Sequence, residues 1–151
     1  MSTTMRAIIK PTAGPGLIMT EVPIPRPGVN DVLIKIRKTS ICGTDVHINK
    51  WDSWAQRVIK PPLVIGHEYV GTVEDVGNGV SGFTKGQLVT GEGHIVCGHC
   101  RNCLAGRRHL CPNTIGVGVN RDGAFADYVS IPSSNVWKVP AGMDLDVVSC
   151  F

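Results

Sequence analysis

The chain has 151 residues, enough for one domain of ordinary size with its own core. Its 15 basic and 12 acidic residues leave a net charge of +3, and the basic residues are scattered, which argues against a nucleic-acid partner. The first residues lack the apolar core of a signal peptide, and no stretch is apolar enough to span a membrane, so we expect a cytoplasmic protein without a membrane partner.

Short strands are predicted along most of the chain. Six segments with alternating or β-branched apolar residues are predicted as strands: Met5–Lys10, Leu17–Val22, Val32–Thr39, Glu68–Val76, Gln87–Thr90 and Ala124–Ile131. The first two would pair across the Pro- and Gly-containing segment 11–16, and a Pro-rich extended loop follows them. Thr44–Asn49 is predicted as one turn of helix, and the fourth strand ends in the turn Gly77-Asn78-Gly79.

The remaining segments are predicted as loop and as the beginning of a helix. Residues 91–112 are polar and rich in Cys and Gly, which predicts a loop. The last segment starts at Asp144 and carries apolar residues at Leu145, Val148 and Phe151, as an amphipathic helix would, so we expect the natural chain to continue. Many short strands separated by turns predict a mainly β, barrel-like core with little helix.

Four cysteines in the predicted loop have the spacing of a metal site. They follow the pattern C-x2-C-x2-C-x7-C and are Cys97, Cys100, Cys103 and Cys111. Four thiolates are a common ligand set of structural Zn²⁺. An iron–sulfur cluster would need a shorter last gap, and two disulfides are disfavoured in a reducing compartment. The spacing predicts one structural zinc, with His99 and His109 as exposed loop residues.

A second group combines three other metal-binding side chains. Cys42 follows the clearest strand, and His67-Glu68 follows the apolar run 63–65. A thiolate, an imidazole and a carboxylate are ligand types of a catalytic zinc site that keeps one position open. Taken singly, however, such a Cys is usually a core residue and a His-Glu pair is usually on the surface.

The order of these motifs resembles the zinc-dependent medium-chain alcohol dehydrogenases. The resemblance covers essentially the whole chain and is carried by Cys42-Gly-Thr-Asp-x-His, Gly66-His-Glu-x-x-Gly and the four-cysteine segment. Within that family, three segments resemble the branch that oxidises L-threonine: residues 34–48, Gly91-Glu-Gly-His and residues 111–121. The resemblance implies that residues 1–151 form a GroES-like catalytic domain, a partly open β-barrel with short helices and a zinc-binding loop, ahead of a Rossmann coenzyme domain.

The resemblance also implies roles for individual residues. Cys42, His67 and Glu68 would bind a catalytic zinc, Thr44 and His47 would form a proton relay, and His94 would be a histidine of the substrate pocket. The alternatives are a helix N-cap for Thr44, an exposed helical position for His47 and simple packing for His94. Trp51 and Trp54 are open to either pocket-lining or core packing. Gln87 departs from the family pattern, which predicts a local change in a turn.

The implied reaction is oxidation of L-threonine to 2-amino-3-oxobutanoate with NAD⁺ by a homotetramer holding two zinc ions per chain. Residues 116–121 lack the third glycine of a dinucleotide-binding motif, so this domain alone is expected to be inactive. Two alternatives stay open: another zinc-dependent polyol or secondary-alcohol dehydrogenase, and a non-catalytic zinc-binding module.

Overall fold

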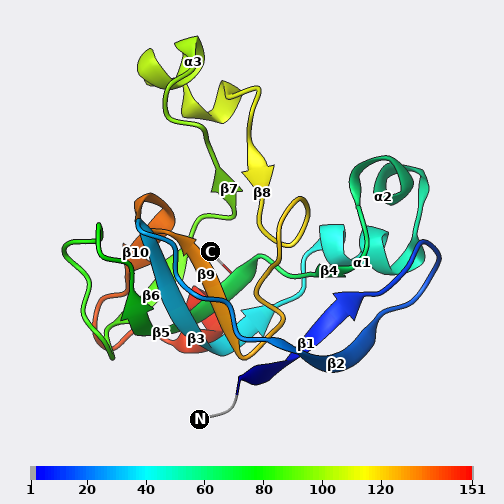
Figure 1. Ribbon diagram of the computed structural model, residues 1–151, viewed down its shortest axis with the longest axis horizontal. Coiled ribbons are helices and arrows are strands. Elements are labelled where there is room, and N and C mark those ends of the chain that lie inside the picture. The colour runs from blue at the N-terminus through cyan, green and yellow to red at the C-terminus, as the bar shows by residue number, and fades with distance from the viewer. Residues whose placement is uncertain (1–2, 151) are drawn as a thin grey trace.

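The computed structural model describes residues 3–150 and is mainly β, as the sequence predicts (Figure 1). The strands are β1 (Thr4–Lys10), β2 (Ile18–Pro23), β3 (Asp31–Ser40), β4 (Leu63–Val64), β5 (Glu68–Val76), β6 (Leu88–Gly91), β7 (His94–Ile95), β8 (Ile115–Gly116), β9 (Tyr128–Pro132) and β10 (Val136–Lys138). The helices are α1 (Gly43–Lys50), α2 (Ser53–Val58), α3 (Arg101–Leu104) and α4 (Leu145–Val148), with the 3₁₀ turns η1 (Arg108–Leu110) and η2 (Ser133–Asn135). No helix among these described residues is long and apolar enough to cross a membrane.

Three antiparallel sheets make up the fold. The largest has the strand order β10-β6-β5-β3-β9, the second has the order β2-β1-β4, and β7 pairs with β8 alone. Over residues 3–150 these sheets remain separate instead of closing into one barrel, which agrees with the predicted partly open form. In Figure 1 the lobe that contains α3 extends away from the sheets, while α1 and α2 lie beside β4.

Two apolar cores meet at one segment of the chain. The first lies against the largest sheet and comprises Val32, Ile34, Tyr69, Val73, Val89, Val117, Ala124, Val129, Ile131 and Val136. The second lies between the α1–α2 helices and β4 and comprises Ile48, Ala55, Ile59, Leu63 and Ile65. The segment 63–69 passes from the second core to the first, so His67 and Glu68 are held at the junction by buried residues on both sides.

Three glycines allow the backbone to cross itself directly beside His67. A Cβ atom on Gly123 would lie 2.2 Å from the carbonyl oxygen of Gly66, and one on Gly118 would lie 2.4 Å from the same oxygen. Gly66 itself has φ of +91°, in the region that favours glycine. Backbone hydrogen bonds close the crossing, including Gly123 N–H to Val64 O at 2.8 Å. The crossing therefore requires residues without side chains and fixes where His67 leaves the core.

The predicted elements agree with the structure in most places and differ in a few. Glu68–Val76 is confirmed to the residue, and a helix begins where the last segment predicts one, with Asp144 as the N-cap residue of α4. Phe151, the last predicted apolar position, lies outside the described residues. Of the last predicted strand, Ala124–Ile131, only the part from Tyr128 onward is regular and belongs to β9, because the preceding residues bond to 6–8 and to 64–66. The predicted loop 91–112 also contains β7, α3 and η1, each too short for a periodic pattern to reveal. The sequence reading also missed α2, β4, β8 and β10.

The crossing can be tested by adding one methyl group. We expect Gly123→Ala to lower the free energy of unfolding by about 3 kcal/mol, because the new Cβ would overlap backbone atoms that cannot move aside. Gly43→Ala is the matched control, since nothing lies within 4 Å of its added Cβ, and it should change stability by less than about 0.5 kcal/mol. Denaturant unfolding measures both variants. Equal stability of the two would contradict the steric argument.

Candidate metal centres

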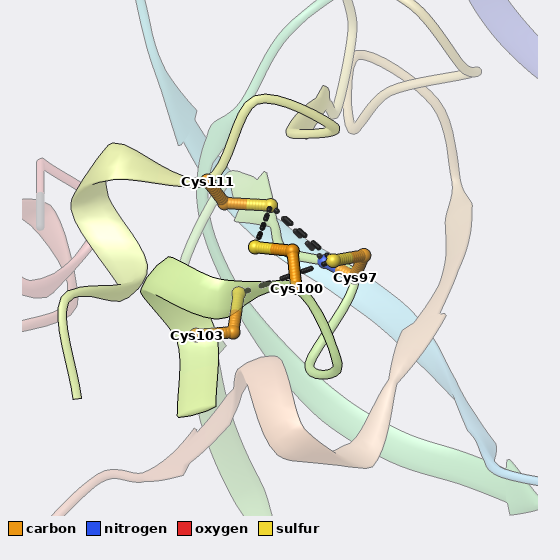
Figure 2. Close-up of side chains that lie close together, drawn as sticks. All are labelled: Cys97, Cys100, Cys103 and Cys111. Atoms are coloured by element: carbon orange, nitrogen blue, oxygen red, sulfur yellow. Dashed lines mark hydrogen bonds between the residues drawn. The ribbon is translucent and has the colours of Figure 1, made fainter. Parts of the chain in front are cut away.

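Four cysteine sulfurs converge in the lobe formed by residues 97–111. Figure 2 shows the side chains of Cys97, Cys100, Cys103 and Cys111 pointing toward one another. The Cys97–Cys111 sulfur pair is 3.6 Å apart, and the Cys97–Cys103 and Cys100–Cys111 pairs are both 4.0 Å apart. A tetrahedron with Zn–S bonds of about 2.3 Å has edges of about 3.8 Å, so the spacing fits one zinc ion. All six cysteines of the chain are free.

The electrostatics of this cluster favour a bound cation. The backbone N–H of His99 is directed at the Cys97 sulfur and lowers the pKa of that thiol to about 6. Burial raises the pKa of Cys103, which lies among the other sulfurs. Four thiolates this close repel one another, so a divalent cation is what allows all four to ionise together. His99 and His109 are exposed, as predicted, and the Nδ1 of His99 bonds to the carbonyl oxygen of Cys97 at 2.7 Å.

The second predicted ligand set also comes together. Ligand atoms of Cys42, His67 and Glu68 all lie within 4.8 Å of one another. Cys42 reaches the site from the end of β3, where it is the N-cap residue of α1, and the other two come from the junction before β5. They line a cavity of about 470 Å³ together with Thr44 and His94. Three ligands facing an open cavity are the arrangement of a catalytic zinc site.

Asp45 belongs to this site, although the sequence reading gave it no role. It is 4% exposed, and one carboxylate oxygen accepts the backbone N–H of Cys42 at 3.0 Å. The other oxygen lies 4.0 Å from Nδ1 of His67, and both of these buried atoms otherwise lack a partner. Burial raises the pKa of Asp45. A carboxylate behind a ligating histidine orients the ring toward a metal, so the unpaired atoms themselves indicate that the residues fit one.

The predicted relay residues lie on one face of α1. Thr44 Oγ1 is 3.7 Å from the Cys42 sulfur, and His47 is three residues further along the helix. The N-cap alternative for Thr44 is wrong, because Cys42 occupies that position. Nδ1 of His47 bonds to the carboxylate of Asp52, which also caps α2.

Both tryptophans pack against the second core, but their other contacts differ. Trp54 lines the cavity and meets the ring of His47 edge-on at 6.1 Å between centroids. Trp51 packs against the second core, with the ammonium of Lys10 over its ring at 4.9 Å. Only Trp54 is therefore placed to contact a molecule in the cavity.

His94 and Gln87 also have defined places. His94 is on β7 and lines the same cavity as the second ligand set. The preceding residue, Gly93, lies so close to His67 that an added Cβ would be 3.4 Å from the Cβ of that histidine. Gln87 ends a tight turn in which its backbone N–H donates to Thr84 O at 3.1 Å.

Comparisons with known proteins give one family and several related enzymes. The profile of the alcohol dehydrogenase GroES-like domain matches residues 28–141. An L-threonine 3-dehydrogenase of Mesorhizobium japonicum is 59% identical over 151 residues, which is 100% of this chain and 44% of that protein. The chain thus spans less than half the length of this curated relative.

Solved structures share the fold across nearly the whole chain. A cobalt- and zinc-bound thermostable alcohol dehydrogenase from Pyrobaculum aerophilum matches with a TM-score of 0.83 and 31% identity, covering 97% of this chain and 44% of that one. Galactitol-1-phosphate dehydrogenase from Escherichia coli matches with a TM-score of 0.86 and 27% identity, covering 96% and 41%.

The four-cysteine cluster predicts that zinc binding requires all four sulfurs. We expect Cys103→Ser to lose one zinc ion per chain and to leave the 97–111 lobe susceptible to proteolysis, because metal binding and ordering of the lobe are coupled. The sheets should stay folded. Cys150→Ser is the control, since that cysteine is exposed and belongs to neither ligand group. Metal analysis and limited proteolysis measure the effect, and an unchanged zinc content in Cys103→Ser would disprove the site.

Asp45 can be tested without disturbing its backbone contact. In Asp45→Asn the amide oxygen can still accept the Cys42 N–H, but the NH₂ group would face Nδ1 of His67. We expect the zinc affinity of the Cys42, His67 and Glu68 site to fall by about 10–100-fold, with the cysteine cluster unaffected. Chelator competition measures both sites. Asp144→Asn is the control, because it changes another aspartate at a helix start, and it should alter the zinc affinity of neither site. If Asp45→Asn weakened only the zinc bound by the four cysteines, the assignment of Asp45 would be wrong.

Proposed function

The chain belongs to the alcohol dehydrogenase GroES-like domain family, and we propose that it is the catalytic domain of a zinc-dependent L-threonine 3-dehydrogenase. The observation that carries the proposal is the cavity in which Cys42, His67 and Glu68 meet beside Thr44 and His94. In the proposed reaction L-threonine is oxidised at its hydroxyl-bearing carbon to 2-amino-3-oxobutanoate.

The proposal extends to parts of the protein outside this chain. The Mesorhizobium relative is more than twice as long as the region it shares with this chain. We propose that the corresponding remainder of this protein is a Rossmann domain that binds NAD⁺, and that the whole enzyme is a cytoplasmic homotetramer. Residues 1–151 would then supply the metal and substrate sites but not the hydride acceptor, and would be inactive alone.

The donor sets suit two zinc ions with different tasks. Cys97, Cys100, Cys103 and Cys111 would hold a structural ion, because four sulfurs complete a tetrahedron and leave no place for substrate. Cys42, His67 and Glu68 would hold a catalytic ion, which as a Lewis acid would lower the pKa of the substrate hydroxyl.

The residues of α1 provide a path for the hydroxyl proton. Thr44 can accept this proton with its hydroxyl oxygen while its own hydrogen passes toward His47, one helical turn away. Because Asp52 holds Nδ1 of His47, Nε2 of that ring is left to exchange the proton with solvent, where His47 is 58% exposed. The carbon-bound hydrogen would leave with its electron pair to NAD⁺ bound by the remainder of the protein.

A polyol or secondary-alcohol dehydrogenase is the second candidate. It is favoured by the close fold match to galactitol-1-phosphate dehydrogenase, though at 27% identity against 59% for the threonine enzyme. A non-catalytic zinc-binding module is the third candidate, and the ligand set that opens into a cavity argues against it, because such a protein has no use for an open metal position.

Turnover and metal content together decide among these. We expect the whole enzyme to reduce NAD⁺ with L-threonine far more efficiently than with galactitol or 2-butanol, and to contain two zinc ions per chain. Spectrophotometric kinetics and metal analysis provide the measurements. A preference for a polyol would support the second candidate, and one zinc ion with no turnover of any alcohol would support the binding module.

A further inference from the structure

Glu92 and His94 form a hydrogen-bonded pair at the edge of the cavity. One carboxylate oxygen of Glu92 accepts both the backbone N–H of His94, at 2.8 Å, and its ring Nδ1, at 2.7 Å. The double contact fixes the backbone and the ring of the histidine to the same atom. His94 can therefore present only its Nε2 atom to a molecule in the cavity.

The backbone that carries the pair is held from several directions. The side-chain amide of Asn135, which is buried, donates to the carbonyl oxygens of Glu92 and His94, both at 3.0 Å. Gly93 O accepts the N–H of Val117 at 2.9 Å, and His94 pairs with Gly116 across β7 and β8. The side chain of His94 is 77% exposed and that of Glu92 is 51% exposed. Their backbone is nevertheless held next to His67, because Gly93 between them lies against that residue.

The charge on Glu92 decides which nitrogen of the His94 ring carries the proton. Burial raises the pKa of Glu92, but the hydrogen bonds from His94 outweigh it and leave the pKa below its usual value. An ionised carboxylate is an acceptor only, so Nδ1 of His94 is the donor, and in the neutral ring Nε2 then carries a lone pair. The ring thus offers the cavity an acceptor backed by a negative charge.

The charge nearest the His94 ring is negative. The described lining of the cavity contains neither Lys nor Arg, and its carboxylate Glu68 is assigned to the metal, whereas the neighbouring cavity that Glu92 and His94 both line also contains Arg108. The charge that decides at the ring is therefore that of Glu92, which bonds to it directly at 2.7 Å. A substrate carboxylate would be repelled by Glu92 behind the ring, whereas an ammonium group would be attracted. Of the two charged groups of an amino acid, the ammonium is the one that a ring backed by a carboxylate attracts.

We propose that Glu92 is a specificity-determining residue that positions His94, so that Nε2 of His94 accepts a hydrogen bond from the ammonium group of the substrate. This inference rests on the proposed function, because it names the part of the amino-acid substrate that the site recognises. Glu92 acts in two ways: its hydrogen bonds set the orientation and protonated nitrogen of the ring, and its charge favours a cation.

Glu92→Gln separates these two roles. The amide oxygen of Gln can accept the same two hydrogen bonds, so His94 keeps its place while the negative charge is lost. Two pairs of alcohols differ only in the ammonium group: L-threonine with 3-hydroxybutyrate, and 1-amino-2-propanol with 2-propanol. In the whole enzyme we expect kcat/KM for the two ammonium compounds to fall about five- to ten-fold, mainly through KM, since solvent screens a half-exposed carboxylate. The other two should change less than about two-fold.

A double-mutant cycle tests whether Glu92 acts through His94. We expect His94→Ala to lower kcat/KM for the ammonium compounds by at least ten-fold, and Glu92→Gln to add less than about two-fold in that background. Glu74→Gln is the matched control, because Glu74 pairs with Lys85 at the surface and should leave all four substrates unaffected. Activity on 2-propanol verifies that each variant is folded and loaded with zinc.

Two results would overturn the inference. An equal loss with all four substrates would mean that Glu92 supports the metal site or the fold, and a loss confined to the carboxylate-bearing compounds would mean that the pair binds the other end of the substrate. Failure of the proposed function looks different: the parent enzyme would oxidise 2-propanol but not L-threonine. In that case the comparison of 1-amino-2-propanol with 2-propanol still decides whether the pair recognises an ammonium group.

Discussion

The glycine crossing of residues 66, 118 and 123 is the constraint on which the cavity depends. Because none of the three carries a side chain, the segment before His67 can lie directly against two other stretches of backbone. The same contact brings Val117, Val119 and Asn120 into the lining of the cavity together with the ligand residues. Two apolar cores lie on either side of the segment, so packing fixes where the backbone of His67 leaves the core.

The two metal-binding groups obtain their geometry in different ways. The cysteine cluster is contained in residues 97–111, a lobe with only short helical turns, and we expect its order to depend on the metal that the sulfurs bind. The other group is assembled from the end of β3 and the start of β5, both anchored in the largest sheet. A local cluster suits a structural role, whereas a site built on rigid strands can keep a position open for substrate.

Each of the three histidines in or near the cavity has a carboxylate facing its Nδ1 atom. Asp45 faces His67, Asp52 holds His47, and Glu92 holds His94. In each case the contact is at Nδ1, which leaves Nε2 for the proposed task of binding metal, exchanging a proton or binding substrate. Two of these carboxylates, Asp45 and Asp52, also bond to backbone N–H groups at helix starts, so helix formation and ring orientation are coupled.

The sequence by itself determined the mainly β class, most strand positions and the four-cysteine group, because periodicity and cysteine spacing are local properties of the chain. The sequence also led to the family, through motifs that keep their residues in order. The grouping of Cys42 with His67 and Glu68 came from the family resemblance, because Cys42 lies 25 positions before His67 and no local pattern joins them. The partners of the histidines were not accessible in this way. Asp45 lies 22 positions before His67 in the sequence, and the approach of Gly123 to Gly66 spans 57 positions. Only tertiary packing brings such atoms together, since no local pattern encodes a contact whose two halves lie on separate strands and loops.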